Sequence, residues 1–386
     1  MPISSGRARA LSARALPLLF LLLALLPSCR KGGSSNASTA FPVQSDGNSG
    51  CLFAGPDLTA PTLETLFGPG GPTGRVDGPL ADPGTRISFA TYGGVSADGT
   101  ANRVYLACGD PSIRVIDFDT GTITTLVDEA AFAAFDPAIV ELGAVAILDA
   151  NRLLVAEHSR NTILAVNRVS GALSLFAGIP SATGGFADGL ALGGSLFHFD
   201  GVGGLAVDGS RRVLVADSGN HRIRSIQGPN VSTLVGSGVP GYLDGTGTRA
   251  QLDEPSGLAI GCNDTLVFTE RGQHLREVRL VQSRSGVNGV VTTRAGNGLG
   301  ASVDGTAAPN GIASVHDPLA PMTLPNGDIV WVDRASGKLR WLLALLNTVA
   351  TPLPAFTVDG IAAMTVTADD SLVLFDAASQ AIVRVR

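Results

Sequence analysis

The sequence predicts an all-β protein built from repeated four-stranded antiparallel sheets that close into a ring. Three observations lead to this fold class: a strand–turn–strand pattern recurs six times, further short apolar strands flank each copy, and the composition favours strands and turns. The chain has 386 residues, of which 49 are glycine, 45% are hydrophobic and only 16% are charged. With a mean hydropathy of +0.28, it can bury a large core.

The recurring unit is clearest in "VLVADSGNHRIRSI", which begins at Val213. Apolar alternation on both sides of a polar turn is typical of a hairpin with one buried face. The related copies begin at Val104, Leu153, Leu266, Ile329 and Leu372. The first strand of five copies ends in an acid, and these are Glu157, Asp217, Glu270, Asp333 and Asp376. We expect the acids to accept hydrogen bonds from backbone N–H groups of the turn, and Cys108 takes their place in the first copy.

A further short strand precedes each hairpin and another follows it, so each unit is a four-stranded antiparallel sheet. The sixth unit stops after three strands, at Arg386, and a spare strand, "TLETLFG", lies near the other end of the chain at Thr62–Gly68. We expect this N-terminal strand to complete the sixth sheet. Six sheets stacked radially bury each other's faces, which is the architecture of a β-propeller. Linkers of one type, "GRVDG", "GFADG", "GYLDG" and "ASVDG", precede four of the sheets.

One linker departs from this pattern. The stretch Asp128–Leu142, between the first and second sheets, lacks the "DG" pair, and we expect a helical turn there. The glycine-rich "GSGVPG" at Gly236–Gly241 matches a dinucleotide-binding fingerprint. That interpretation requires a helix directly after the glycines, whereas "YLDGTGTRAQ" is loop-like. We therefore interpret "GSGVPG" as a turn between sheets.

The third copy, with its Gly-apolar strand, "VADSGNHRIR" and "TLVGSG", resembles the repeats of the NHL family. The other copies are degenerate, and the resemblance covers roughly residues 60–386. It implies a six-bladed NHL-type β-propeller, which we assign to residues 59–386 as a single closed domain. Propellers serve many functions, so the resemblance by itself names none.

Residues 1–28 have the features of a secretory signal. Arg7, Arg9 and Arg14 precede an apolar run at Ala15–Leu26, which is shorter than the roughly 20 residues that span a bilayer. The run ends in "LPSC", which resembles a bacterial lipobox and implies that Cys29 is lipidated and becomes the first mature residue. An ordinary signal peptide with a coincidental cysteine is the alternative.

Residues 29–58 follow as the lipidated cysteine and a flexible tether rich in Ser, Gly and Asn. Because Arg30 rather than Asp follows the cysteine, the resemblance favours the outer membrane over the inner one. We therefore expect a lipid-anchored protein of the bacterial cell envelope, in contact with the membrane only through its anchor. The periplasmic and surface-exposed orientations both stay open.

Charge and cysteine content limit the partners. The formal net charge is −6, and removal of the three arginines of residues 1–28 makes it −9. An acidic chain lacks the basic footprint that a nucleic acid requires. With Cys29 lipidated, Cys51, Cys108 and Cys262 remain, so at most one disulfide forms within the chain, and three buried thiols are the alternative.

The candidate metal ligands precede the inner strands of the sheets, where strand starts converge on a central channel. The aligned residues at these starts are Ala90, Val140, Asp200, Asp253, His316 and Asp359. We single out Asp200, Asp253, His316 and Asp359, with Glu254 and Asp317 as neighbouring carboxylates. Such a set suits Ca²⁺, and the histidine admits another divalent metal. The alternative, which we favour, is a solvated polar channel mouth whose acids cap loop amides and bind no cofactor.

Two related propeller families bear on catalysis. Peptide-amidating lyases, by resemblance, place a metal-binding histidine beside the inner-strand glycine. Histidine is absent from the equivalent positions, which are Thr91–Gly93, Gly143, Gly203, Ser256, Ala320 and Ala362. Gluconolactonase-like propellers use a carboxylate, an asparagine and an aspartate around the channel. Glu254 and Asp200 match part of that set, and no asparagine completes it.

Two main functional hypotheses follow. The first is an exported lipoprotein whose propeller is a binding or scaffold module for a protein, peptide or glycan in the envelope. The second is a metal-dependent hydrolase or lactonase with its site at the channel mouth. A purely structural envelope component is a third class. The sequence names no catalytic residue and no ligand-binding residue.

Cys29 provides the first test. Replacing Cys29 with Ser removes the only thiol of the lipobox-like motif, so the protein should lose incorporated palmitate and move from the membrane fraction to the soluble fraction. Fractionation of the producing bacterium with labelled palmitate measures both changes. Cys51→Ser is the matched control and should retain label and membrane association. Equal labelling of Cys29→Ser and the wild type would contradict the lipoprotein hypothesis.

Overall fold

The structure is a computed structural model. It describes residues 63–67, 75–82, 85, 87, 94–98, 102–197, 204–261, 265–271, 273–283, 286–307, 311–324, 326–353, 360–367 and 371–385. The chain divides into two compact units, Met1–Thr39 and Ala40–Arg386. Every described residue belongs to the second unit, so the predicted signal, Cys29 and the tether lie outside the described residues.

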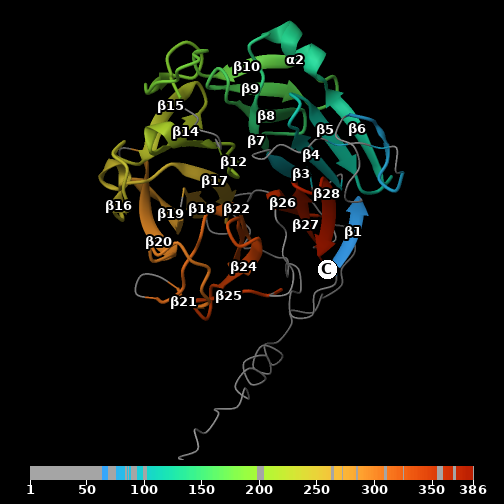
Figure 1. The fold of residues 1–386 in the computed structure, drawn as a ribbon. Coiled ribbons are helices and arrows are strands. Elements are labelled where there is room, and N and C mark those ends of the chain that lie inside the picture. Colours follow the sequence, from blue (N-terminus) through green and yellow to red (C-terminus); the bar gives the residue numbers. More distant parts are fainter. Residues whose placement is uncertain are drawn as a thin grey trace, which may run out of the picture. The chain divides into compact units, whose positions relative to one another are not determined.

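The described residues form six antiparallel sheets arranged around a common axis (Figure 1). Blade 1 contains β2 (Gly78–Pro79), β3 (Val95–Asp98), β4 (Arg103–Ala107), β5 (Ile113–Asp117) and β6 (Thr122–Val127). Blade 2 contains β7 (Leu142–Ile147), β8 (Arg152–Glu157), β9 (Thr162–Asn167) and β10 (Leu173–Ala177). Blade 3 contains β11 (Gly189–Leu190), β12 (Leu205–Val207), β13 (Val213–Asp217), β14 (Arg222–Gln227) and β15 (Asn230–Val235).

The second half of the chain repeats this order. Blade 4 contains β16 (Gly245–Thr246), β17 (Pro255–Ile260), β18 (Thr265–Glu270), β19 (His274–Ser283) and β20 (Gly286–Ala295). Blade 5 contains β21 (Gly305–Thr306), β22 (Pro318–Thr323), β23 (Ile329–Asp333), β24 (Lys338–Leu343) and β25 (Thr348–Ala350). Blade 6 contains β26 (Ile361–Val366), β27 (Leu372–Asp376), β28 (Ala381–Val385) and β1 (Leu63–Phe67). The sequence prediction of six blades is thereby confirmed.

The ring closes through β1, which pairs with β28 as the outer strand of blade 6. Leu63 lies opposite Val385, and Thr65 lies opposite Val383. This confirms the predicted closure by an N-terminal strand. The two-residue strands β2, β11, β16 and β21, which the sequence analysis did not foresee, come from the "DG" linkers and add a fifth strand to the outer edges of blades 1, 3, 4 and 5.

The core lies between the blades. Six apolar clusters each combine residues from two adjacent blades, including one that joins Phe375 of blade 6 to Val104 of blade 1. Small residues let the inner strands approach each other at the axis. A Cβ on Gly204 would lie 2.1 Å from the carbonyl oxygen of Ser256, and one on Gly257 would lie 2.4 Å from Pro321 Cδ. Glycine occurs at the start of these inner strands because adjacent blades approach each other too closely there for a side chain.

A buried arginine joins the strands within four of the blades. In blade 4, Arg276 of β19 is completely buried and donates to Glu270 at 2.9 Å and to Asp244 of the preceding linker at 2.8 Å. Asp244 in turn accepts the backbone N–H and the hydroxyl of Thr293 on β20, each at 3.0 Å. The linker, the second strand, the third strand and the outer strand are thus held by one connected set of charges and hydrogen bonds.

The same set recurs in blades 1, 3 and 5. The buried arginines are Arg114, Arg224 and Arg340. Their linker partners are Asp77, Asp188 and Asp304. The threonines that complete each set are Thr125, Thr233 and Thr351. Asp217 and Asp333 are the second-strand acids of blades 3 and 5, and Cys108 occupies that position in blade 1.

Blades 2 and 6 lack the arginine. In blade 2 the equivalent pair across β9 and β10 is Leu164 and Leu175, and in blade 6 Val383 takes the place of the arginine. Blade 2 also lacks the linker aspartate, because the preceding segment forms α2 (Glu129–Phe135) instead. Asp128 caps this helix by accepting from Ala131 N–H at 2.9 Å. The predicted departure from symmetry is confirmed, and it coincides with the loss of the whole charged set.

The second-strand acids therefore have two structural roles. In blades 2 and 6, Glu157 and Asp376 accept backbone N–H groups of the turn, as predicted. In blades 3, 4 and 5 the acid also pairs with the buried arginine, which the sequence analysis missed. Among the described residues, no helix is long and apolar enough to cross a membrane.

Arg276→Met should destabilise the protein strongly, because it leaves the fully buried Glu270 without its cation. We expect a loss of about 3–5 kcal/mol in the free energy of unfolding at about pH 8. The loss should be smaller at about pH 5, because Glu270, whose pKa burial already raises to about 7, then takes up a proton. Arg279→Met is the matched control, since Arg279 is exposed on the same strand. Denaturant unfolding measures both variants, and equal losses would contradict the assigned role.

Candidate functional site

The candidate site is the channel mouth, defined as the end of the central channel at which the inner strands begin. Of the four predicted metal ligands, Asp253 and His316 are described, and they precede β17 and β22 at this mouth. Asp200 and Asp359 lie outside the described residues. Within the described part of the chain, no group of three or more His, Cys, Asp or Glu residues is placed to hold a metal ion. The four-residue metal site therefore stays a prediction.

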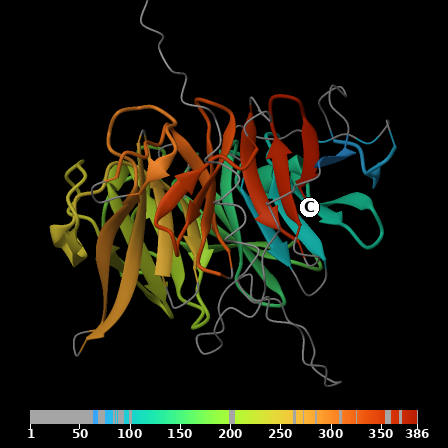
Figure 2. The same ribbon diagram turned by 90° about the horizontal axis from the view of Figure 1, so that it is seen from below.

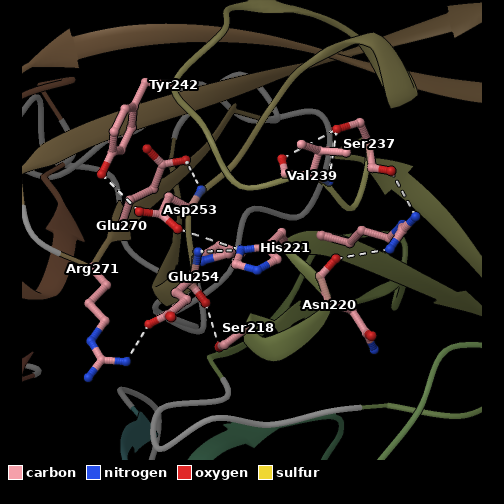
Figure 3. Close-up of polar contacts among 12 residues, drawn as sticks. Ser218, Asn220, His221, Ser237, Val239, Tyr242, Asp253, Glu254, Glu270 and Arg271 are labelled. Atoms are coloured by element: carbon pink, nitrogen blue, oxygen red, sulfur yellow. Dashed lines mark hydrogen bonds and ion pairs between the residues drawn. The ribbon is translucent and has the colours of Figure 1, made fainter.

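Asp253 is held by neighbours from blades 3 and 4 (Figure 3). Its carboxylate accepts from the hydroxyl of Tyr242 at 2.9 Å and lies 3.7 Å from Nδ1 of His221. Its backbone N–H donates to Glu270 at 3.2 Å. The carboxylate of Asp253 thus contacts protein groups. The hypothesis of a polar channel mouth expects contacts of this kind.

The neighbouring His221 is committed to the backbone. It lies in the turn after β13, and its Nδ1 accepts from the backbone N–H of Glu254 at 3.2 Å. Nδ1 is therefore the unprotonated nitrogen, and Nε2 carries the proton. Because its lone pair is used, Nδ1 is unavailable to a metal ion in this arrangement.

Three carboxylates at the mouth each lie beside an arginine or a histidine of the same blade. Glu254 accepts from Arg271 at 2.5 Å in blade 4, as Figure 3 shows, and Asp317 pairs with Arg334 at 2.6 Å in blade 5. In blade 2, Glu141 lies 3.6 Å from Nδ1 of His158. The predicted neighbouring carboxylates Glu254 and Asp317 are thus neutralised locally, which weakens their attraction for a metal cation.

Backbone geometry fixes these pairs. Glu254 and Asp317 have positive φ angles of 46° and 53°, and each precedes a proline that begins the inner strand. The carbonyl oxygen of Glu254 accepts from Arg271 N–H at 3.3 Å, and that of Asp317 accepts from Arg334 N–H at 3.0 Å. The hydrogen bonds and ion pairs hold a backbone conformation that costs non-glycine residues free energy.

Below the mouth the channel is narrow and apolar. A cavity of about 110 Å³ is lined by the inner strands of all six blades. Its walls alternate small residues with larger apolar ones, such as Gly94 with Val95, Ala144 with Val145, and Ala363 with Met364. Pockets that enclose drug-sized ligands have volumes of roughly 300–1,000 Å³. The channel therefore accommodates a few waters or a small group, and a larger ligand has to lie across the mouth.

The sequence analysis missed the side chains that face these carboxylates at the mouth. His158, Arg271 and Arg334 each follow directly after the acid that ends the second strand. That position would have identified them, because a residue just beyond a second strand lies beside the start of the inner strand. Cys108, by contrast, is a buried free thiol whose pKa burial raises to about 12. Cys51 and Cys262, the other two cysteines considered for a disulfide, lie outside the described residues.

Residues 199–224 match the family model for the NHL repeat. This segment is similar to an NHL repeat. It contains most of the hairpin of blade 3, in agreement with the predicted resemblance. In the Arabidopsis thaliana protein SUPPRESSOR OF QUENCHING 1, a segment is 32% identical to this chain over 113 residues, which is 26% of this chain and 10% of that protein. The chain thus matches about a tenth of the length of that relative.

Solved propeller structures resemble the whole ring. An auxiliary nutrient binding protein from Bacteroides ovatus is 12% identical with a TM-score of 0.62, over 84% of this chain and 76% of that one. Its counterpart from Bacteroides thetaiotaomicron has the same identity and coverage with a TM-score of 0.61. A Xanthomonas campestris gluconolactonase is 14% identical with a TM-score of 0.51, over 78% and 87% of the two chains. At these identities the likeness establishes the fold alone.

The mouth of blade 4 contains a histidine that resists protonation. The ring of His274 lies 4.1 Å from that of Tyr242, and its Nδ1 is buried without a hydrogen-bond partner among the described residues. Burial, and next the nearby Arg276, lower the pKa of His274 to about 4. Burial also raises the pKa of Tyr242 to about 12, and the hydrogen bond to Asp253 adds to this shift.

His274 should make the propeller acid-sensitive. Its folded pKa lies below the ordinary value, so the unfolded chain binds a proton that the folded chain does not, and stability falls as the pH drops from about 6.5 to about 4. Each pKa unit corresponds to about 1.4 kcal/mol, so the wild type should lose about 3 kcal/mol more than His274→Gln over this window. Denaturant unfolding at several pH values measures the difference. Parallel pH curves for the two proteins would contradict the prediction.

Proposed function

We propose that this chain is an exported, lipid-anchored binding protein of the cell envelope, whose channel-mouth face binds a protein, peptide or glycan. The observation that carries the proposal is the presence of two charge pairs, Glu254–Arg271 and Asp317–Arg334, at the mouth of a channel too narrow to enclose a ligand. A ligand placed there contacts a surface rather than a closed pocket. Such contact suits a macromolecule or an extended peptide or glycan better than a small substrate.

The paired charges suit recognition. Arg271 is two-thirds exposed in its side chain while it contacts Glu254, and Arg334 is one-third exposed beside Asp317. Their guanidinium groups are held in place and partly exposed, and N–H groups of this kind donate to a ligand's carboxylates, carbonyls or hydroxyls. Because the charges are balanced within each pair, recognition is expected to depend on hydrogen-bond geometry more than on net attraction.

The export part of the proposal rests on the sequence features of residues 1–28 and Cys29. The flexible tether of residues 30–58 would present the propeller to ligands near the membrane. Two of the structurally similar proteins are called auxiliary nutrient binding proteins, which supports a binding role for this propeller as well.

Removing the mouth arginines tests the proposal. The full chain and the double variant Arg271→Ala/Arg334→Ala are compared on a peptide array and a glycan array. The wild type should bind a defined subset of probes, and the variant should bind them at least tenfold more weakly, about 1.4 kcal/mol. Arg249→Ala, an exposed arginine of a linker, is the control and should bind like the wild type. Equal binding by the double variant would contradict a mouth-centred site.

The same preparation tests the metal-dependent alternative. Melting temperature and probe binding are measured before and after EDTA, together with the metal content. The binding proposal expects no change in either quantity. A stoichiometric metal and a lower melting temperature after EDTA would favour the hydrolase hypothesis instead, and Asp200, Asp253, His316 and Asp359 would then be replaced one at a time.

A further inference from the structure

A second cavity lies at the end of the ring opposite the mouth, between blades 3 and 4. Its volume is about 400 Å³, which is within the range of small-molecule sites. Arg212, which lines it, precedes β13, whereas the other end of β13 meets the mouth at Asp217. Gln227 and Asn230 also line it, at the end of β14 and the start of β15. The cavity is therefore separate from the mouth and does not depend on the function proposed there.

The cavity wall is a polar face of blade 3. Two cross-strand pairs form it, Ser225 opposite Ser232 and Gln227 opposite Asn230. Within the described part of the chain, these four side chains make no hydrogen bond. Ser225 is nevertheless 92% buried, with 8% of its surface exposed. Its hydroxyl is not among the fully buried atoms that lack a partner, so it is open to water or to a ligand in the cavity, and the side chains of Gln227, Asn230 and Ser232 are exposed.

Blade 3 differs from the other blades at this position. At the position of Ser225, the other blades carry Val115, Ala165, Glu277, Trp341 and Arg384. Glu277 approaches Arg294 at 3.7 Å and Arg384 approaches Glu64 at the same distance, so those charges are directed to protein partners. In blade 5 the bulk of Trp341 takes up the position. Two facing serines occur together only in blade 3, which leaves both volume and free hydroxyl groups there.

Blade 4 supplies the opposite wall through an extended hairpin. β19 and β20 have ten residues each, whereas their counterparts in the other blades have three to six. Figure 2 shows this pair, coloured orange to gold, projecting beyond the neighbouring strands. Val287 of β20 lines the cavity with Leu234 of β15. A Cβ on Gly289 would lie 2.4 Å from Val235 Cγ1, so this glycine permits the hairpin to press against blade 3.

The charge of the cavity is balanced. Arg212 is 95% buried, and its Nε and Nη2 donate to Asp208 at 2.7 and 2.5 Å. An anionic ligand therefore finds no uncompensated cation. The remaining polar lining consists of hydroxyl and amide groups, which both donate and accept hydrogen bonds. These groups can pair with a ligand whose own groups also both donate and accept hydrogen bonds. Leu234 and Val287 provide a small apolar surface beside them.

We propose that the cavity between blades 3 and 4 binds a neutral polyhydroxylated ligand, a mono- or disaccharide, through the side chains of Ser225, Gln227, Asn230 and Ser232. The hydroxyl groups of the sugar satisfy the unpaired groups of the wall, and its C–H face lies against Leu234 and Val287. The sugar thereby replaces water at a site that the fold preforms.

Saturation-transfer NMR on the full chain tests this inference. The neutral probes are glucose, galactose, N-acetylglucosamine, maltose and sucrose, and the anionic probes are glucuronate and inorganic phosphate. At least one neutral sugar should bind saturably. Ser232→Trp places a large side chain in the cavity and should raise the Kd at least tenfold. Ser174→Trp is the matched control, because Ser174 holds the equivalent position in blade 2, and it should leave the Kd unchanged.

Asn230→Ala is a second variant that removes one amide from an exposed strand start, and it should weaken the same sugar at least threefold. Circular dichroism confirms that each variant is folded. The proposal is overturned if no neutral sugar binds, if only the anionic probes bind, or if Ser232→Trp and Asn230→Ala bind sugar as the wild type does. Variants of the mouth arginines serve to separate the sites, since Arg271→Ala/Arg334→Ala should leave sugar binding at this cavity intact.

Discussion

A fully buried arginine in four of the six blades is the interaction on which the structure depends most. Each of these arginines lies among hydrophobic residues, where an unpaired charge would be prohibitively costly. The carboxylate of the preceding linker has to reach it, and this requirement sets the path of the linker along the outer edge of the blade. The linker aspartate then fixes the outer strand through a threonine. Blade 2 replaces the arginine with Leu164, and its linker is correspondingly free to form a helix instead.

This arrangement separates stability from recognition. The buried charges and apolar clusters lie within and between the blades, whereas the mouth pairs Glu254–Arg271 and Asp317–Arg334 lie at the solvent boundary. Exposed pairs contribute little to folding free energy. Their residues can therefore change with little cost to the ring. The cavity between blades 3 and 4 follows the same logic, because two serines and a longer hairpin create it without altering the blade framework.

Most of the fold could be predicted from the sequence because strand alternation and turn residues recur with each blade. The closing strand and the irregular segment before blade 2 were recognisable as departures from that repeat. Arg224, Arg276 and Arg340 each lie on the strand that follows a second-strand acid. The sequence analysis did not recognise them as buried, because charged residues are usually exposed. Each mouth pair joins a residue just before the inner strand to one just after the second strand of the same blade, a position that the sequence analysis did not consider. The second cavity depends on which side chains of blades 3 and 4 surround Ser225. The sequence of a single strand does not reveal those neighbours.

The closure of the ring by β1 and β28 has a consequence for the order of folding. The pairing of Leu63 with Val385 joins the two most distant strands of the domain, so it has the largest loop-closure entropy of all the strand pairs. Blades built from local hairpins can form first, while the sheet that completes the circle must wait for β28 to be synthesised. Until then β1 and blade 6 each present an unpaired strand edge, which is the feature that invites association with other chains. The interval before closure is thus the period in which this protein is most exposed to misassembly and most in need of a chaperone.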